Sequence, residues 1–142
     1  MLSAAPHLRY LILYATSRCN LRCDHCFYVE ELTGHNELTL PELRRVARSV
    51  CPLQFLRITG GEPFLRSDLP LVVETFVRES GVKRIGLITN GTLPETVASG
   101  VQEIYSRCPS IELDVGVSVD GLRDTHDRLR NRSGVFDQCR ST

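Results

Sequence analysis

The chain has 142 residues, of which 42% are apolar and 24% charged, a composition typical of one soluble globular domain with its own core. Its 17 basic and 17 acidic side chains balance, so the charge gives no support to binding of nucleic acid or of an anionic membrane. The apolar run at residues 10–15 is too short for a membrane span or a signal-peptide core, so we expect a soluble, cytoplasmic protein.

Strand-like and helix-like segments alternate along the chain. Residues 9–16 are rich in aromatic and branched apolar residues and predict a strand. Residues 39–50 predict a helix that opens with a Thr39–Glu42 capping box. The later elements are a strand at 54–59, a helix at 67–80 ended by Gly81, a strand at 82–89, a helix opening at 92–95 and a strand at 111–119. This β-α alternation predicts a parallel sheet with right-handed crossovers.

Each predicted strand leads into an unusual loop. CNLRCDHC follows the first strand, GGEP the second and NG the third, while SVDG ends the fourth. In parallel α/β folds the site lies at the carboxyl ends of the strands. All four loops are therefore expected to meet at one edge of the sheet and to form one site.

The fourth strand alternates strictly between apolar and polar residues. In a closed or partly closed barrel the apolar set would pack on the helices and the polar set would line the interior. The apolar set is Ile111, Leu113, Val115, Val117 and Val119, and the polar set is Glu112, Asp114, Gly116, Ser118 and Asp120. Ser118 and Asp120, nearest the carboxyl end, are expected to point towards the site.

The cysteines fall into two groups. Cys51, Cys108 and Cys139 are scattered and are interpreted as buried or incidental thiols, whereas the other three crowd into eight residues and resemble metal ligands of a reducing compartment. Thiolates select zinc, copper(I) or iron–sulfur clusters, and structural zinc needs four ligands. His25 lies between two of the cysteines and is interpreted as a loop residue. A cubane cluster with three protein thiolates would keep one iron open for a substrate or cofactor.

The pattern Cys19-x3-Cys23-x2-Cys26, followed by Phe27, resembles the cluster loop of radical S-adenosylmethionine (SAM) enzymes. GGEP at 60–63 matches that family's second motif. SVDG at 118–121 with HDRLR at 126–130 resembles the subgroup of SPASM-type peptide maturases and molybdenum-cofactor cyclases. The resemblance runs from about Leu11 to Arg130. It implies the first four β-α units of a (βα)6 TIM-like barrel with parallel strands.

The resemblance also implies the cofactors and the reaction. Cys19, Cys23 and Cys26 would ligate a 4Fe–4S cluster whose open iron chelates the methionine part of SAM. Reductive cleavage of SAM would give methionine and a 5′-deoxyadenosyl radical that abstracts hydrogen from a substrate. That substrate would be a peptide, a protein or a cofactor precursor, and the electron donor a flavodoxin or a ferredoxin.

Eight further residues would bind SAM on this resemblance: Phe27, Gly60, Gly61, Glu62, Pro63, Ser118, Asp120 and Arg130. Phe27 would lie near the adenine or pack beneath the loop. The two glycines would let the backbone approach the methionine moiety or serve a turn that Pro63 fixes. Glu62 would accept from the SAM ammonium, brace the loop or be a solvated acid. Ser118 would face the ribose or carboxylate, and Arg130 would clamp a carboxylate or lie on the surface.

The family core has about six β-α units, and each needs ~30 residues or more. We therefore expect residues 1–142 to be a single, truncated core domain, and the last strand to be an exposed edge through which the isolated chain associates. The alternatives are a non-catalytic iron–sulfur, SAM-binding or electron-transfer module, a zinc-stabilised scaffold, or an inactive fragment.

Overall fold

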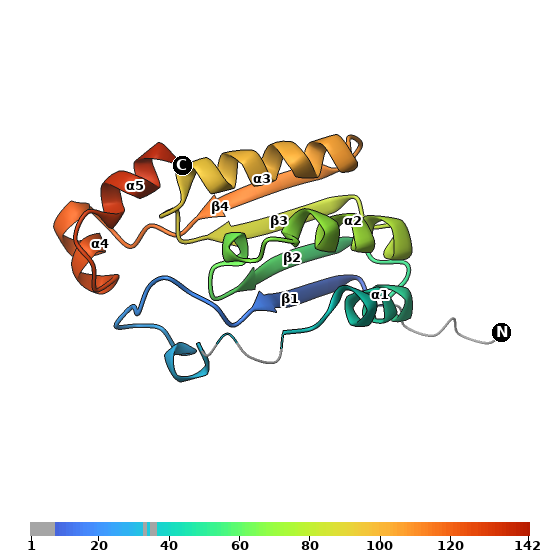
Figure 1. Ribbon diagram of the computed structural model, residues 1–142, viewed down its shortest axis with the longest axis horizontal. Helices are drawn as coiled ribbons and strands as arrows, with labels where there is room; N and C mark the ends of the chain where they lie inside the picture. The colour runs from blue at the N-terminus through green and yellow to red at the C-terminus, as the bar shows by residue number, and fades with distance from the viewer. Residues whose placement is uncertain (1–7, 33, 35–36) are drawn as a thin grey trace.

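A four-stranded parallel sheet forms the centre of the protein (Figure 1). The computed structural model describes residues 8–142 except 33, 35 and 36. The strands pair in chain order, each with the next: β1 (Tyr10–Thr16), β2 (Phe55–Gly60), β3 (Arg84–Thr89) and β4 (Glu112–Val117). This arrangement confirms the predicted parallel α/β fold, and the sheet has the strand order of a partial barrel.

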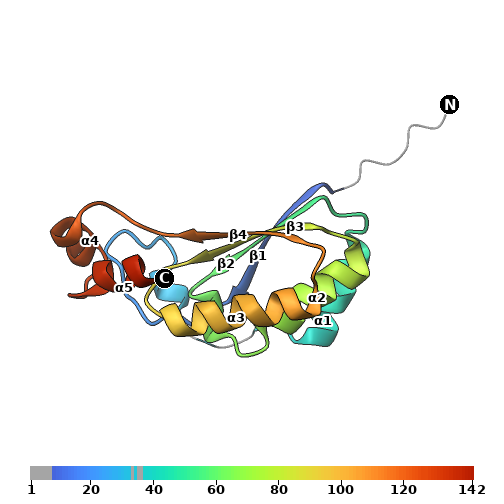
Figure 2. The same ribbon diagram turned by 90° about the horizontal axis from the view of Figure 1, so that it is seen from above.

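Three helices connect the strands and cover one face of the sheet (Figure 2). They are α1 (Leu40–Ser49), α2 (Leu69–Ser80) and α3 (Pro94–Arg107). The core lies between these helices and the apolar side chains of the strands, among them Leu56, Ile58 and Ile85, which are fully buried.

The helix boundaries follow local signals in the sequence. The predicted capping box opens α1, where the backbone N–H of Thr39 donates to the Glu42 carboxylate at 2.8 Å. Gly81 ends α2 in the left-handed conformation, with φ at 72°. Helix α3 begins without a side-chain cap, because its N-cap residue is Leu93, whose side chain has no acceptor. The preceding Thr92 donates to Asn90 Oδ1 from both its backbone N–H and its hydroxyl.

The chain after β4 folds at the carboxyl ends of the strands, beside the cysteine loop (Figures 1 and 2). Two helices form here, α4 (Arg123–Leu129) and α5 (Val135–Ser141). The break spans residues 130–134, in which Asn131 and Gly134 have positive φ angles of 55° and 80°. Asp127 bridges it by accepting from the backbone N–H groups of Gly134 at 2.6 Å and Phe136 at 2.9 Å. Two shorter 3-10 turns are η1 (Val29–Glu31) and η2 (Pro63–Leu65).

The face of the sheet opposite the helices is open. Tyr10, Ile12 and Tyr14 lie about half exposed along β1 on this face. On β4 the predicted alternation is present but the apolar row is only partly covered: Ile111 is buried, whereas Val115 is 36% exposed and Val119 54%. No helix in the described part of the chain is long and apolar enough to cross a membrane.

Candidate cluster and cofactor site

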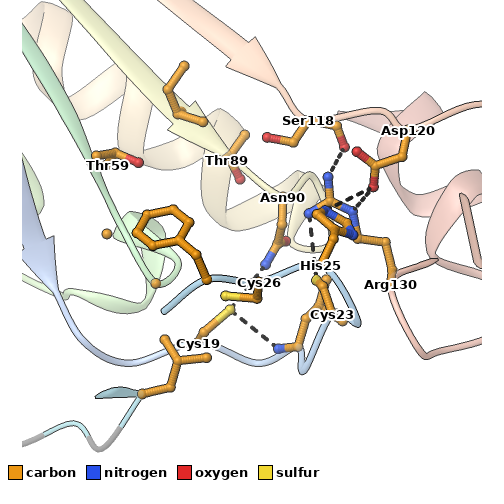
Figure 3. Close-up of a pocket in the computed structure, with 16 residues that line it drawn as sticks. Cys19, Cys23, His25, Cys26, Thr59, Thr89, Asn90, Ser118, Asp120 and Arg130 are labelled. Carbon is orange, nitrogen blue, oxygen red and sulfur yellow. Dashed lines mark hydrogen bonds and ion pairs between the residues drawn. The ribbon is translucent and has the colours of Figure 1, made fainter. Parts of the chain in front are cut away.

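One pocket of about 340 Å³ opens at the carboxyl ends of the four strands (Figure 3). This volume is in the range of small-molecule sites. Its wall takes residues from the loops after all four strands: Cys19, Leu21, Cys23, His25, Cys26, Phe27, Leu32, Thr59, Gly60, Gly61, Ile88, Thr89, Asn90, Ser118, Asp120 and Arg130. The structure therefore brings the four sequence motifs together, as the positions of the loops predict.

The three clustered cysteines all line this pocket as half-buried, free thiols. Their loop is held by a turn in which the N–H of Cys26 donates to the carbonyl of Cys23 at 3.1 Å. A second tie runs to the far end of the chain, where the N–H of Asp24 donates to the carbonyl of Leu129 at 3.0 Å. The loop after β1 and helix α4 thus form one structural unit.

The donors around these thiols suit an iron–sulfur cluster. N–H groups of Leu21 and Asn90 lie 3.4 and 3.9 Å from Cys19 Sγ, and a guanidinium N–H of Arg130 lies 3.7 Å from Cys23 Sγ. Hydrogen bonds to cysteine sulfurs stabilise and tune such clusters. Burial, and next the approach of Glu62, raise the pKa of the Cys19 thiol above its ordinary value despite the N–H donors.

Among the residues that the structure describes, no three histidine, cysteine or acidic side chains converge on a point that could hold a single metal ion. Structural zinc needs such convergence of four ligands. A cubane cluster instead takes each thiolate on a different iron, so its ligands are spaced apart around one cavity. The three thiols face one pocket, as a cluster with three protein ligands requires.

Gly60 and Gly61 bring the end of β2 against the cysteine loop. A Cβ atom on Gly61 would lie 2.1 Å from the carbonyl oxygen of Arg18, and one on Gly60 would lie 2.4 Å from that of Thr16. The next backbone N–H, of Glu62, donates to the same Arg18 oxygen at 2.7 Å. Both glycines also line the pocket. Their immediate role is close backbone packing, which places the cysteine loop beside the pocket.

Glu62 is fully buried, so the interpretation as a solvated acid is wrong. Its carboxylate accepts from the N–H of Asn90 at 2.7 Å, the hydroxyl of Thr89 at 2.9 Å and the N–H of Phe64 at 3.2 Å. It lies behind the pocket wall, and Pro63, also buried, begins η2 beside it. Bracing of the loop is therefore the alternative that the structure supports. Burial raises the pKa of Glu62, and its three hydrogen bonds only partly oppose this.

Replacing Glu62 by alanine should leave these three donors unpaired in the interior. Loss of a charged, buried hydrogen-bond acceptor costs roughly 1.5–3 kcal/mol, and we expect the free energy of unfolding to fall by about that amount. Glu95→Ala, which removes an exposed carboxylate at the start of α3, should change it by less than about 0.5 kcal/mol. Chemical denaturation of both variants checks the prediction. Equal stability of the two would show that Glu62 does not brace the loop.

Phe27 lies at the mouth of the pocket with 86% of its surface exposed. The alternative in which Phe27 packs beneath the loop is therefore wrong. Its ring contacts Tyr28, with a centroid distance of 6.3 Å and a tilted geometry. An aromatic ring left in solvent beside a pocket is available to stack on a planar ligand.

Ser118 and Asp120 line the pocket, as the alternation along the fourth strand predicts. Arg130 is buried, so the alternative of a surface arginine is wrong. Its Nε lies 2.6 Å from Asp120 Oδ2, and its Nη2 donates to the carbonyl of Ser118 at 3.0 Å. Burial acts to lower the pKa of Arg130, but the ion pair with Asp120 outweighs it and the pKa is raised.

Two residues near the site were missed by the sequence analysis. Asn90 enters the sequence analysis only as part of the NG loop, but it is buried, lines the pocket, and donates to Asn20 Oδ1 at 2.9 Å. His126 is fully buried behind Asp120, whose N–H it accepts at 3.1 Å. An Asn-Gly pair is typical of an exposed turn, so the sequence gives no sign that Asn90 is buried. His126 is the first residue of the HDRLR motif, and that position is the signal by which it could be found.

Three cysteine thiols and a pocket of cofactor size lie together at one edge of a parallel sheet. This arrangement defines the class of protein: a domain that binds an iron–sulfur cluster and a second cofactor beside it. The family model of the radical SAM superfamily matches residues 13–140, and the chain belongs to this superfamily. The superfamily's cofactors are a 4Fe–4S cluster and SAM, which agrees with the thiols and the pocket described above.

Curated relatives and solved structures agree with this assignment. The chain is 34% identical over 126 residues to the Fe-coproporphyrin III synthase of Methanosarcina barkeri (strain Fusaro / DSM 804), covering 86% of this chain and 30% of the relative. It is 33% identical over 138 residues to the GTP 3′,8-cyclase of Pasteurella multocida (strain Pm70), covering 90% and 41%. The chain thus spans about a third of the length of these relatives.

Two solved structures share the fold. The structure of Streptococcus suis SuiB bound to S-adenosylmethionine superposes with a TM-score of 0.71 at 20% identity, over 95% of this chain and 30% of that one. The structure of anSMEcpe with bound AdoMet and the Cp18Cys peptide gives 0.65 at 24% identity, over 96% and 39%. At these identities the likeness establishes the fold, and it confirms the predicted partial barrel.

Proposed function

We propose that this chain is the cluster- and SAM-binding part of a radical SAM enzyme. The observation that carries the proposal is the convergence of Cys19, Cys23 and Cys26 with the ends of β2, β3 and β4 on one pocket. When bound, the reduced cluster supplies the electron that cleaves the sulfonium of SAM. The protein's part is to hold these groups together.

The roles of the pocket residues follow from their positions. The three thiolates hold the cluster at the floor, and the close backbone packing of Gly60 and Gly61 keeps them beside the end of β2. Phe27 stacks on the adenine of SAM at the mouth. The hydroxyl of Ser118 is assigned to the ribose or the carboxylate. Asp120, whose carboxylate is paired with Arg130, acts through that arginine.

The substrate of the whole protein is a further proposal. One relative's name specifies a coproporphyrin product and another's specifies GTP, whereas the anSMEcpe structure holds a bound peptide. On this basis we propose that the substrate of the whole protein is a peptide or a cofactor precursor. A small redox protein such as flavodoxin or ferredoxin would supply the electron. Six cysteines without a disulfide fit the reducing conditions of the cytoplasm, which we propose as the location.

Replacing Phe27 by alanine should weaken SAM binding without weakening the fold, because the ring is exposed and supports no core contact. Aromatic stacking contributes about 0.5–1.5 kcal/mol, so we expect a loss of affinity of roughly two- to twelvefold. Anaerobic titration calorimetry on the cluster-loaded protein measures it, with thermal unfolding as the check on stability.

Leu122→Ala is the matched control. Leu122 is also a large, apolar residue and is 81% exposed, but it lies outside the pocket lining. This variant should bind SAM like the parent. Equal affinity of the Phe27→Ala variant and the parent would contradict the assignment of Phe27 to the adenine.

A further inference from the structure

The guanidinium of Arg130 has a protein partner at each of its three nitrogens (Figure 3). Nη2 donates to the carbonyl of Ser118 at 3.0 Å, and Nε lies 2.6 Å from Asp120 Oδ2. Nη1 lies 3.7 Å from Cys23 Sγ, within the range of an N–H···S hydrogen bond. The group is therefore already engaged inside the pocket wall, and one of its partners is a sulfur that would bind iron.

A buried scaffold holds this arrangement in place. Asp120, which orients Arg130, is itself anchored, because its backbone N–H donates to Nδ1 of the fully buried His126 at 3.1 Å. The other ring nitrogen of His126 lies 3.5 Å from Cys139 Sγ, and that thiol donates to the carbonyl of Asn90 at 3.0 Å. The SVDG and HDRLR motifs thus act as one framework that fixes a guanidinium against Cys23.

We propose that Arg130 raises the reduction potential of the cluster by donating a hydrogen bond to the Cys23 thiolate, and that it does so before SAM binds. The inference rests on the proposed function, since it requires the cluster. Reduction adds one electron and makes the sulfurs of the cluster more negative. A hydrogen bond to a ligand sulfur therefore stabilises the reduced form more than the oxidised one.

The carboxylate of Asp120 limits how far the positive charge of Arg130 alone can change the potential of the cluster. Asp120 offsets the positive charge of Arg130 at longer range, so the net charge of the pair contributes little at the cluster. The main effect of Arg130 on the potential is therefore its N–H···S contact with Cys23. A carboxylate clamp on SAM would instead affect the protein only when SAM is present. The two roles are separated by measuring the cluster alone.

The test is an anaerobic spectropotentiometric titration of the reconstituted 4Fe–4S protein without SAM. Arg130→Gln should shift the midpoint potential to more negative values than the parent. Arg128→Gln removes the same charge from an exposed position two residues away, and its midpoint potential should equal that of the parent. An unshifted Arg130→Gln variant, or an equal shift in Arg128→Gln, would overturn the proposal.

A second variant carries the test if Arg130→Gln does not fold. Arg130→Lys keeps the buried charge beside Asp120, but one ammonium group cannot contact Asp120, Ser118 and Cys23 together. Where the lysine keeps Asp120 and Ser118 as partners and loses the contact with Cys23, its potential should also be more negative than that of the parent, and an unchanged potential in that state would overturn the proposal. Failure of the parent itself to take up a cluster would instead overturn the proposed function, so the two failures are distinguishable.

Discussion

Alanine at Cys19, Cys23 or Cys26 should abolish assembly of the 4Fe–4S cluster, because each of the three thiols that line the pocket is assigned as one of its three protein ligands. Loss of a metal ligand is among the largest effects of a single substitution. Anaerobic reconstitution followed by iron and sulfide analysis and by the visible absorption of the cluster measures the result.

The three other cysteines provide the controls. Cys51 is exposed, and Cys108 is buried at the end of α3, away from the pocket. Cys139 is the strictest control, since its thiol contacts Asn90 and His126 directly behind the pocket wall. Each of these alanine variants should load a complete cluster. Loss of the cluster in any one of them would contradict the three-ligand assignment.

Replacing Gly61 by alanine should destabilise the protein and empty the cluster site together. The new Cβ would lie 2.1 Å from the carbonyl oxygen and 2.6 Å from the carbonyl carbon of Arg18, the residue before Cys19. Both obstacles are backbone atoms, so the cysteine loop must move away from β2. Overpacking of this kind costs about 1–3 kcal/mol in unfolding free energy, and we expect the upper end because backbone atoms must move.

Gly100→Ala is the matched control for that variant. Gly100 lies inside α3, and a Cβ atom there would meet only the ring of Phe64, at 3.1 Å. The gain in helix propensity of roughly 1 kcal/mol offsets this contact, so stability and cluster content should stay close to those of the parent. Denaturation and iron content are measured on both variants. A Gly61→Ala protein with parental stability and a full cluster would show that the close approach is not required.

The backbone architecture was predictable because it depends on local and periodic signals. Thr39 and Glu42 lie three residues apart in a capping box, and Gly81 alone takes the left-handed conformation that ends α2. The parallel sheet followed from the alternation of elements. The two helices after β4 were harder to foresee, because the break between them depends on the positive φ angles of Asn131 and Gly134 and on the bridge made by Asp127.

The site was predictable in its motifs and less so in the roles of individual side chains. The order of the loops placed the cysteines, GGEP and Ser118 at one edge, and the structure joins them there. Whether Glu62 faces the ligand or the interior depends on the Thr89 and Asn90 donors of the next loop, which sequence spacing does not reveal. The burial of Arg130 likewise depends on how α4 folds back onto the cysteine loop.

The central claim is that three protein thiolates hold a four-iron cluster with one iron left for SAM. Mössbauer spectroscopy of protein reconstituted with ⁵⁷Fe, before and after anaerobic addition of SAM, tests it most directly. We expect SAM to change the isomer shift of one iron, by adding ligands to it, while the others keep their signals. A spectrum in which SAM changes none of the irons would contradict the account.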